Sequence, residues 1–545
     1  MPSSADPVAD VAGAVLASAG ELAGNGASSA ARLDRPPKAE FGDYSSNAPM
    51  LLAPALRQPP REVAQQLADR VRGRLGGALD HAEVAGPGFL NLFMSDEWYR
   101  AAVAAAVEAG DDYGRGRPER PEKVNVEFVS ANPTGPPNAA TGRHAAYGDS
   151  LARILSFAGH EPQREYYVND AGSQVRRFGE SIQARARGED PPEDGYQGEY
   201  VIGLAARIEG AGEMEVDALA HRGVELMVEA MRTTLERYRV SYDRFYFESE
   251  LFDSDAVDRA IDVLRERGHV YESEGATWLR SSAFGDDKDR VLRRSSGEHT
   301  YFAVDIAYHL TKAERGFERL IDVLGADHHG YVGRMKAMWE ALGHDPDGLE
   351  ILIMQLVNLL EGGQRAQMSK RAGTIVTLDE LIDDIGVDAA RFFMLQRSHD
   401  TTLDLDLALA REQSQENPVY YVQYAHARIA SILRKAGEAR VAAALGADLA
   451  GSAEVLHPSA RALVKRLLEL PSEVAVAAER RAPHRMTVYA QDVAQSFSAF
   501  YRDCRVVGAA EEGGDEDFRI ALAVVAKRVI ARSLDLLGVE APEQM

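Results

Sequence analysis

The chain has 545 residues, 45% of them hydrophobic and 27% charged, and a formal net charge of -24 at pH 7. One hydrophobic core rarely serves this length, so we expect a large globular protein with three domains. The acidity excludes a protein that coats nucleic acid through a basic surface. Any RNA partner must meet local patches, and residues 418–545, where acidic and basic side chains balance, are the most tolerant region.

A single cysteine, Cys504, excludes an internal disulfide and a cysteine-only metal cage, which fits a reducing cytoplasm. We expect Cys504 to be a packing residue of a helix. The Ala-rich start carries Asp6 and Asp10 and has no basic leader. No apolar run approaches the roughly 20 residues that a membrane span needs. We therefore expect a cytoplasmic protein with no membrane partner.

Residues 39–97 predict helices followed by AEVAGPGFLNLFM, in which apolar residues alternate on either side of a Gly-Pro-Gly turn. This pattern is typical of a small α+β domain. The stretch 111–123 is rich in Gly, Arg and Pro and has little to bury, so it predicts a boundary. We expect an N-terminal α+β domain over residues 1–115.

The segment VEFVSANPTGPPNAATGRHAAYGD, residues 126–149, predicts a strand that runs through an Asn-Pro-Thr-Gly-Pro turn into an amphipathic helix. Nucleotide-binding α/β sheets begin in this way. Further strands are predicted at 164–168, 321–326 and 351–357, separated by helical periodicity. The helical stretch 171–240 is predicted to be an insertion, with a Pro/Gly/acidic loop at 186–200. A Rossmann-like, doubly wound catalytic domain is therefore expected over residues 121–405.

Strand signals stop after Asp388. The segments 417–437, 461–470 and 521–538 all repeat apolar residues at helical spacing. We expect an α-helical bundle over residues 406–545. The predicted fold class is thus α/β, with an α+β domain before the doubly wound sheet and a helical bundle after it.

From about residue 40 to residue 545 the chain resembles the class I arginyl-tRNA synthetases of bacterial type. The motifs that carry the resemblance are GDYSSNAPM, AGPGFLN, SANPTGP, REYYVNDAG, VLGADHHGY, QMSKRAGT, GVDAARFF, NPVYYVQYAHARI, FYRDCRV and APEQM. Each is weak alone, but their order and spacing are specific to the family. The resemblance implies an arginine–tRNA ligase that activates L-arginine with ATP to arginyl-adenylate and transfers it to the 3′ end of tRNA(Arg). Mg²⁺ is expected to arrive with ATP, and a monomer is expected.

A planar, permanently charged guanidinium needs paired carboxylates as its receptor. By the resemblance, Glu127 and Asn132 hold the α-amino end of arginine. Tyr301 and Asp305 match the family's Tyr-x-x-x-Asp, and Glu248 matches a second acid near the guanidinium. A Tyr and an Asp four residues apart would ordinarily be a surface pair of a helix. The family context favours the binding role.

Arginine activation, attack of a carboxylate on the α-phosphate of ATP, needs positioning groups and cations rather than a nucleophile. The segment QMSKRAG resembles the family's Lys-Met-Ser-Lys-Arg loop, with Gln367 in the place of the first lysine. The resemblance implies that Met368, Ser369 and Lys370 bind ATP and that Ser369 and Lys370 act in catalysis. A solvated Lys-Arg pair on a loop is the alternative.

The family pattern His-x-Gly-His falls on residues 138–141, which here are Asn-Ala-Ala-Thr. Asn138 and Thr141, the expected catalytic residues of this turn, donate hydrogen bonds but carry no charge. Ala140, expected at the ATP contact, adds a methyl group there. Transition-state stabilisation falls by about 1 to 4 kcal/mol if nothing compensates. His144, one turn onward, is a candidate substitute, although helical histidines more often pack.

His328 and His329 in GADHHGY suggest a metal, but adjacent residues point apart and no spaced third ligand follows, so no metal site is expected. By the resemblance, Gly325, Asp327 and His328 line the ATP-binding pocket instead.

Two regions are expected to contact tRNA. By the resemblance, Phe89 and Asn91 recognise an unpaired base of the D-loop, while core packing of Phe89 is the alternative. Tyr420, Tyr424 and Arg428 fall on one stripe of a helix that the family uses near the anticodon, although aromatic stripes more often build cores.

Two other functions stay open on the sequence. A paralogue could retain recognition of tRNA or arginine and lack adenylate formation because of the altered turn. An enzyme of the same class could charge an arginine-like acid or supply a biosynthetic pathway.

Overall fold

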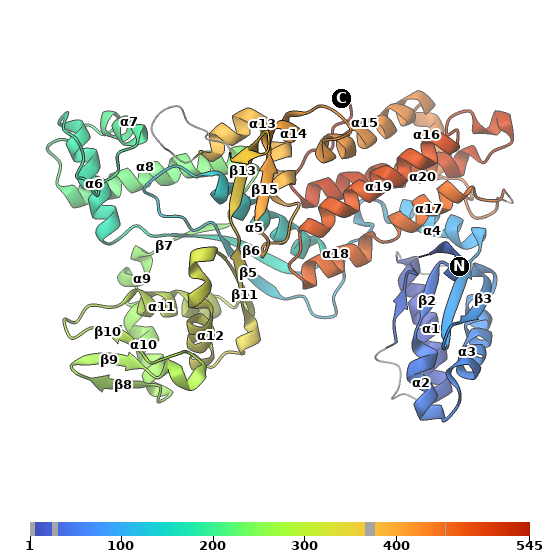
Figure 1. The fold of residues 1–545 in the computed structure, drawn as a ribbon, viewed down its shortest axis with the longest axis horizontal. Coiled ribbons are helices and arrows are strands. Elements are labelled where there is room, and N and C mark those ends of the chain that lie inside the picture. The colour runs from blue at the N-terminus through green and yellow to red at the C-terminus, as the bar shows by residue number, and fades with distance from the viewer. Residues whose placement is uncertain (1–5, 24–30, 37, 366–375, 453) are drawn as a thin grey trace.

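The computed structural model describes residues 6–23, 31–36, 38–365, 376–452 and 454–545. Its N-terminal region is a four-stranded antiparallel sheet with helices against it (Figure 1). The strand order is β1-β2-β4-β3. The elements are α1 (Pro7–Ala23), β1 (Leu33–Asp34), β2 (Tyr44–Ser46), α2 (Ala48–Leu56), α3 (Pro60–Leu75), β3 (Leu79–Ala85) and β4 (Phe89–Met94). The Gly-Pro-Gly segment makes the predicted turn between β3 and β4.

The central sheet has five strands, all parallel, in the order β12-β11-β5-β6-β7. They are β5 (Lys123–Phe128), β6 (Glu161–Val168), β7 (Arg244–Phe247), β11 (Arg319–Gly325) and β12 (Leu349–Met354). This order confirms the doubly wound sheet. Chain order reverses between β5 and β11, so the crevice at their carboxyl ends is where such a sheet binds ligands.

Helix α5 (Ala139–Phe157) follows β5 and packs closely on it. A Cβ added at Gly148 would lie 2.0 Å from Cγ of Phe128, so only glycine fits this contact. The predicted insertion is helical, as α6 (Ser173–Ala186), α7 (Glu199–Arg207) and α8 (Val216–Arg237), and a loop joins α6 to α7. The insertion lies at one end of the molecule, far from the N-terminal sheet (Figure 1).

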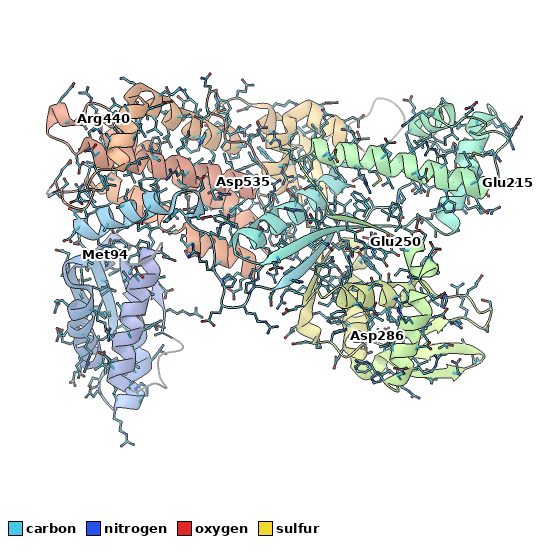
Figure 2. All side chains as sticks on the ribbon, turned by 180° about the vertical axis from the view of Figure 1, so that it is seen from behind. Met94, Glu215, Glu250, Asp286, Arg440 and Asp535 are labelled. Atoms are coloured by element: carbon cyan, nitrogen blue, oxygen red, sulfur yellow. The ribbon has the colours of Figure 1, made fainter. Side chains whose placement is uncertain are left out.

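A further lobe lies below the sheet in Figure 1 and was not predicted. Its antiparallel sheet consists of β8 (Val270–Ser273), β9 (Ala276–Leu279) and β10 (Arg290–Arg293), and its helices are α9 (Ser249–Asp253), α10 (Ala256–Glu266), α11 (Tyr301–Glu314) and α12 (Val332–Ala341). Figure 2 labels Glu250 and Asp286 in this lobe, on the opposite side of the molecule from Met94. Strands of four residues are too short to show a clear period of two in sequence.

The expectation that strands stop after Asp388 was wrong. Strand β15 (Leu403–Asp406) pairs in parallel with β13 (Val357–Glu361), and β14 (Gln364–Arg365) completes this small sheet. The predicted strand 351–357 is accordingly divided, because β12 ends at Met354 and β13 enters the other sheet. The helices beside this sheet are α13 (Leu378–Met394) and α14 (Leu407–Arg411).

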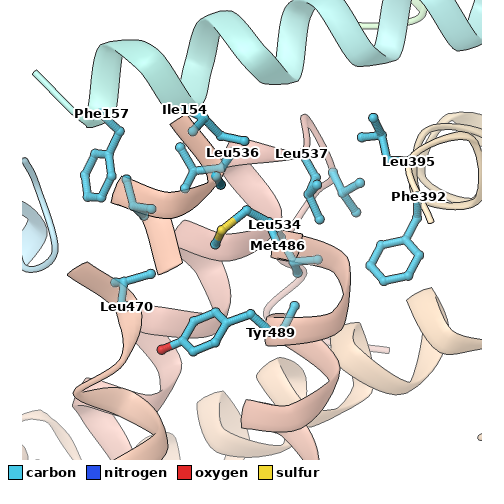
Figure 3. Close-up of a cluster of buried hydrophobic side chains, with 14 of the residues drawn as sticks. Ile154, Phe157, Phe392, Leu395, Leu470, Met486, Tyr489, Leu534, Leu536 and Leu537 are labelled. Carbon is cyan, nitrogen blue, oxygen red and sulfur yellow. The ribbon is translucent and has the colours of Figure 1, made fainter. Parts of the chain in front are cut away.

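The C-terminal region is the predicted helical bundle, with α15 (Pro418–Ala436), α16 (Glu438–Leu445), α17 (Pro458–Leu467), α18 (Leu470–Glu479), α19 (His484–Asp503) and α20 (Glu516–Leu536). Helix α4 (Asp96–Ala109) packs on α20. Figure 3 shows side chains of the bundle, among them Met486 and Leu534, packing with Ile154 of α5 and Phe392 of α13. Cys504 is buried, as expected, but it is not part of a helix, because α19 ends at Asp503 and Cys504 has an extended backbone. Within the described residues, no helix has the length and apolar character to cross a membrane.

One buried ion pair ties these regions together. The guanidinium of Arg391, on α13, donates to Oδ2 of Asp149 on α5 at 2.6 Å and to the carbonyl of Leu537 at 2.8 Å. Both charged side chains are fully buried. The catalytic sheet and the bundle are therefore joined through charges that have no access to water.

Candidate functional site

The structure brings the three predicted carboxylates together at the carboxyl edge of the central sheet. Glu127 is on β5, Glu248 follows β7, and Asp305 is on α11. Their charges interact, because Asp305 contributes to raising the pKa of Glu248 and Glu127 contributes to raising that of Asp305. The hydroxyl of Tyr167, on β6, donates to Oε2 of Glu248 at 2.9 Å.

Asp305 and Glu248 are carboxylates without a cation. Burial raises the pKa of Asp305 to about 6, although His309 and a hydrogen bond from Tyr331 act in the opposite direction. Burial also raises the pKa of Glu248, and nearby acids add to it. Tyr331 donates to Oδ2 of Asp305 at 2.9 Å. Neither carboxylate forms an ion pair with any residue that the structure describes.

Glu127, by contrast, already has a counter-ion that the sequence analysis missed. Nζ of Lys312, on α11, donates to Oε2 of Glu127 at 2.6 Å and to Oδ1 of Asp322 at 3.0 Å. The Lys312 side chain is fully buried. Burial acts to lower its pKa, but Asp322 and Glu127 raise it above its ordinary value, so the ammonium stays charged. His309 completes the network at 2.8 Å from Oδ2 of Asp322.

A signal for Lys312 was present in the sequence. Asp305, His309 and Lys312 are spaced by four and three residues, which places them on one face of α11. Most other residues of this helix are apolar and buried. A polar stripe on an otherwise apolar helix would have pointed to the network.

Asn132 and Tyr301 lie on the accessible side of the site. Both are exposed, and 66% of Tyr301 is accessible. Nδ2 of Asn132 donates to Oε1 of Gln174 at 2.8 Å. The Tyr301 hydroxyl is 3.9 Å from a Cβ added at Gly172. Asn132 and Tyr301 therefore approach the same segment, at the start of α6.

At the nucleotide end, Asn138 and Thr141 begin helix α5 as a capping box. Oδ1 of Asn138 accepts a hydrogen bond from the backbone N–H of Thr141 at 2.9 Å. The Thr141 hydroxyl accepts one from the backbone N–H of Asn138 at 3.4 Å. This reciprocal pair satisfies amides that a helix start leaves free. Nδ2 of Asn138 has no hydrogen-bond partner among the residues that the structure describes. Ala140 is exposed beside them.

The segment that follows the predicted nucleotide loop lies against this helix start. The Ala139 amide donates to the Val376 carbonyl at 3.0 Å, and the Leu378 amide donates to the Pro137 carbonyl at 2.8 Å. Val376 is the first described residue after the loop. Gln367, Met368, Ser369 and Lys370 lie outside the described residues.

The other residues predicted for the nucleotide site lie at the end of β11. Gly325 ends the strand, and Asp327 and His328 follow as exposed side chains. His144 faces the same strand through a hydrogen bond with the Val323 carbonyl. Burial, reinforced by Arg143, lowers the pKa of His144 to about 4. His144 is therefore neutral at pH 7 and does not replace the charge of a lost family histidine.

Phe89 and Asn91 line one cavity of about 430 Å³ in the N-terminal region. Phe89 is 38% exposed, so it is not a core residue, and the ring of Phe41, on the same cavity, is 40% exposed. Asn91 is buried and accepts from the Ser45 hydroxyl at 2.7 Å. Arg35 also lines the cavity. Phe41 and Arg35 were missed because they stand in irregular segments without periodicity.

Tyr420, Tyr424 and Arg428 form a ladder on α15. The two tyrosine rings stack with centroids 6.3 Å apart and planes at 11°. Arg428 donates to the Tyr424 hydroxyl at 3.1 Å and lies 4.6 Å from the ring centroid of Tyr501. The tyrosines are half-buried and Arg428 is exposed. The stripe is therefore accessible to a partner.

Three family descriptions match the chain: "Arginyl tRNA synthetase N terminal domain" over residues 10–94, "tRNA synthetases class I (R), catalytic domain" over 209–428 and "DALR anticodon binding domain" over 422–545. A Frankia alni protein named arginine–tRNA ligase is 44% identical over 553 residues, covering 98% of this chain and 100% of the relative. A Geobacillus kaustophilus protein of the same name is 44% identical and covers 94% of each chain. The solved arginyl-tRNA synthetase of Thermus thermophilus superposes with a TM-score of 0.77 at 27% identity, covering 97% of this chain and 99% of that chain. The chain therefore belongs to the class I arginyl-tRNA synthetases of bacterial type.

Proposed function

We propose that this aminoacyl-tRNA synthetase ligates L-arginine to tRNA(Arg), with Asp305 and Glu248 as the receptor of the guanidinium. The observation that carries this proposal is a pair of carboxylates, the buried Glu248 and the partly buried Asp305, that have tyrosine donors but no cation among the described residues. Buried charges in proteins are otherwise paired. A guanidinium is planar, always charged and rich in donors, and so supplies what both carboxylates lack.

The α-amino end of arginine would meet Glu127 and Asn132, with Tyr301 at the entrance. Lys312 holds Oε2 of Glu127 at 2.6 Å, while Oε1 accepts only from the Ser130 hydroxyl, at 2.8 Å, within the described structure. Oε1 is thus the oxygen that is open to a substrate ammonium. In the first step a carboxylate oxygen of arginine attacks the α-phosphorus of ATP, and pyrophosphate leaves. In the second step a hydroxyl of the 3′-terminal ribose of tRNA attacks the arginyl carbonyl carbon, and AMP leaves.

At the nucleotide end, the side-chain amide group of Asn138 has two roles. Its oxygen caps α5, and its free nitrogen would donate to a phosphate at the helix N-terminus, where the backbone dipole also favours an anion. The hydroxyl of Thr141 would be a second polar group beside this phosphate. Ala140, Gly325, Asp327 and His328 are proposed to line the nucleotide pocket. Met368, Ser369 and Lys370 keep their proposed roles on the resemblance alone.

Mg²⁺ would be bound by the phosphates of ATP. Among the described residues, no group of three or more His, Cys, Asp or Glu side chains is arranged to hold a metal ion. An ion that arrives with the nucleotide needs few protein ligands, since Mg²⁺ commonly keeps waters and phosphate ligands.

The tRNA would bind along the whole chain. Phe89 and Asn91 suit stacking and edge recognition of one unpaired base, and the ladder of Tyr420, Tyr424 and Arg428 suits the anticodon. We further propose a cytoplasmic monomer with an α+β domain at 1–115, a catalytic domain at 121–405 and an anticodon-binding bundle at 406–545.

Arginine-dependent exchange of label between ATP and pyrophosphate, run with tRNA(Arg) present, tests this function. We expect exchange with arginine and a decrease of several decades with citrulline, which has no charge to offer the two carboxylates. A protein that binds tRNA(Arg) without any exchange would instead be a non-catalytic paralogue. The relatives, which are named ligases and align over almost the full chain, do not favour that alternative.

A further inference from the structure

The turn between β5 and α5 contains two adjacent residues in an unfavourable backbone conformation. Val129 has a φ of 71° and Ser130 a φ of 41°. Left-handed φ values are uncommon without glycine, and for a β-branched residue such as Val129 they are a real outlier. Such strain persists only where the surrounding structure fixes it, and it is concentrated at functional sites.

Three tyrosine hydroxyls fix this turn. Tyr242 donates to the carbonyl of Phe128 at 3.1 Å, Tyr166 to that of Ala131 at 2.9 Å, and Tyr200 to that of Thr134 at 2.6 Å. The donors come from three separate places: the segment before β7, strand β6 and helix α7. The turn is therefore held at its beginning, middle and end. We name these residues, Tyr166, Tyr200 and Tyr242, the tyrosine clamp.

The strained residues lie between two proposed ligands of the substrate, Glu127 and Asn132. The Ser130 hydroxyl donates to Oε1 of Glu127 at 2.8 Å and accepts from the Tyr167 amide at 3.1 Å. The left-handed conformation at residues 129 and 130 thus determines where this hydroxyl meets the carboxylate. A relaxed turn would move the Ser130 hydroxyl and the Asn132 side chain together.

Two neighbouring residues of strand β6 form hydrogen bonds to the turn and to the proposed arginine pocket. Tyr166 holds the Ala131 carbonyl, while Tyr167, pointing to the opposite face, donates to Glu248. Tyr200 is different because it stands on the helical insertion, 66 residues from its acceptor Thr134. Burial raises the pKa of Tyr200 to about 12, so its hydroxyl remains a donor at neutral pH.

We propose that the tyrosine clamp positions the arginine site by holding the strained turn, and that the insertion contributes to arginine binding through Tyr200. The proposal rests on the proposed function. The three tyrosines are positioning residues, since each acts on the backbone of the turn. The expected consequence is a change in arginine binding that does not extend to ATP.

The test uses Tyr200→Phe, which removes one hydroxyl and leaves the ring in the half-buried site. The matched control is Tyr113→Phe, because Tyr113 donates to the Leu467 carbonyl at 3.1 Å, away from the site. KM for arginine and KM for ATP are measured in the pyrophosphate exchange assay, together with the melting temperature. We expect KM for arginine to rise roughly two- to tenfold in Tyr200→Phe only, with KM for ATP unchanged in both variants.

A wild-type KM for arginine in Tyr200→Phe, or an equal rise of both KM values, would overturn the proposal. A wild-type protein without any arginine-dependent exchange would contradict the proposed function instead, so the two failures are distinct.

A second pair of variants tests the strain itself. Val129→Gly removes the Cβ that makes a φ of 71° costly, whereas Val129→Ala shortens the side chain and keeps that Cβ. We expect Val129→Gly to melt no lower than Val129→Ala, yet to show the higher KM for arginine because its turn can relax. Equal KM values in the two variants would show that the strained conformation does not position the site.

Discussion

The two ends of the site are built differently. The proposed arginine end consists of buried and partly buried charged side chains, where Lys312 neutralises Glu127 while Asp305 and Glu248 have no cation among the described residues. The nucleotide end, within the described residues, consists of neutral groups at the start of α5, where Asn138 and Thr141 also cap the helix. If these assignments hold, the fold fixes the selection of arginine, whereas contact with ATP depends on groups that share their hydrogen bonds with the backbone.

The largest effect is expected from Asp305→Asn. This change removes the charge that a guanidinium requires but keeps an acceptor for Tyr331, so kcat/KM for arginine should fall by at least about two orders of magnitude. Because burial disfavours the ionised Asp305, the variant should be as stable as the wild type or more stable. Exchange kinetics and thermal unfolding measure both values. Normal activation by the variant would refute the assignment of Asp305.

Lys312→Met should cost stability rather than only activity. The change leaves Glu127 and Asp322 as buried charges without their ammonium counter-ion, so the free energy of unfolding should fall by about 3 to 5 kcal/mol. Urea denaturation measures this loss. The double variant Lys312→Met/Asp322→Asn removes one of these two unpaired charges, so its free energy of unfolding should fall by less. A loss below about 1 kcal/mol in the single variant would show that Lys312 is not the counter-ion of this network.

At the nucleotide end, Asn138→Asp separates capping from phosphate binding. Aspartate keeps the oxygen that caps α5 but lacks the nitrogen that would donate to a phosphate. We expect kcat/KM for ATP to fall about 10- to 100-fold with an unchanged melting temperature. Ser95→Ala, which removes the side-chain cap of α4 away from the nucleotide end, is the control, and it should lower the melting temperature while KM for ATP stays normal. Wild-type kinetics in Asn138→Asp would leave Asn138 with the capping role alone.

The smallest effect is a pH dependence confined to the arginine end. With a pKa of about 6, Asp305 is protonated as the pH falls below 6, and KM for arginine should then rise about tenfold per pH unit while KM for ATP changes little. Protonation of Asp305 weakens arginine binding but stabilises the folded protein. The folded protein binds this proton more tightly than the unfolded chain, so the Asp305 contribution to stability increases as the pH falls from about 6 to about 4. A flat KM for arginine between pH 7 and pH 5 would contradict the raised pKa.

Structure was predicted correctly from sequence where a periodic pattern was long or where many motifs followed one another in order. Four of the five strands of the central sheet, the helical insertion and the bundle were predicted, because each pattern spans enough residues of one period. Prediction failed for β7 to β10 and for β15, since strands of four residues show too few alternations. The partition of β12 from β13 depends on pairing with distant strands, which local sequence does not encode.

The site was predictable only in part. The resemblance supplied Glu127, Glu248 and Asp305, and the structure places them together. Lys312 was missed because its role depends on burial between two strands and a helix. The tyrosine clamp was missed because its donors lie up to 114 residues from their acceptors, and hydrogen bonds of that range follow from the fold and not from spacing.

The ion pair between Asp149 and Arg391 has a consequence for synthesis on the ribosome. The two residues are 242 positions apart, and both are fully buried. At about 5 to 20 residues per second, the aspartate emerges roughly 10 to 50 seconds before its arginine is made. During that interval Asp149 has two other counter-ions, Arg153 one turn further on α5 and Arg164 on β6, and both of these arginines are partly exposed to solvent. Translation speed thereby sets the earliest moment at which α5 gains its fully buried counter-ion, and the contact of Arg391 with the carbonyl of Leu537 follows only when the bundle is complete.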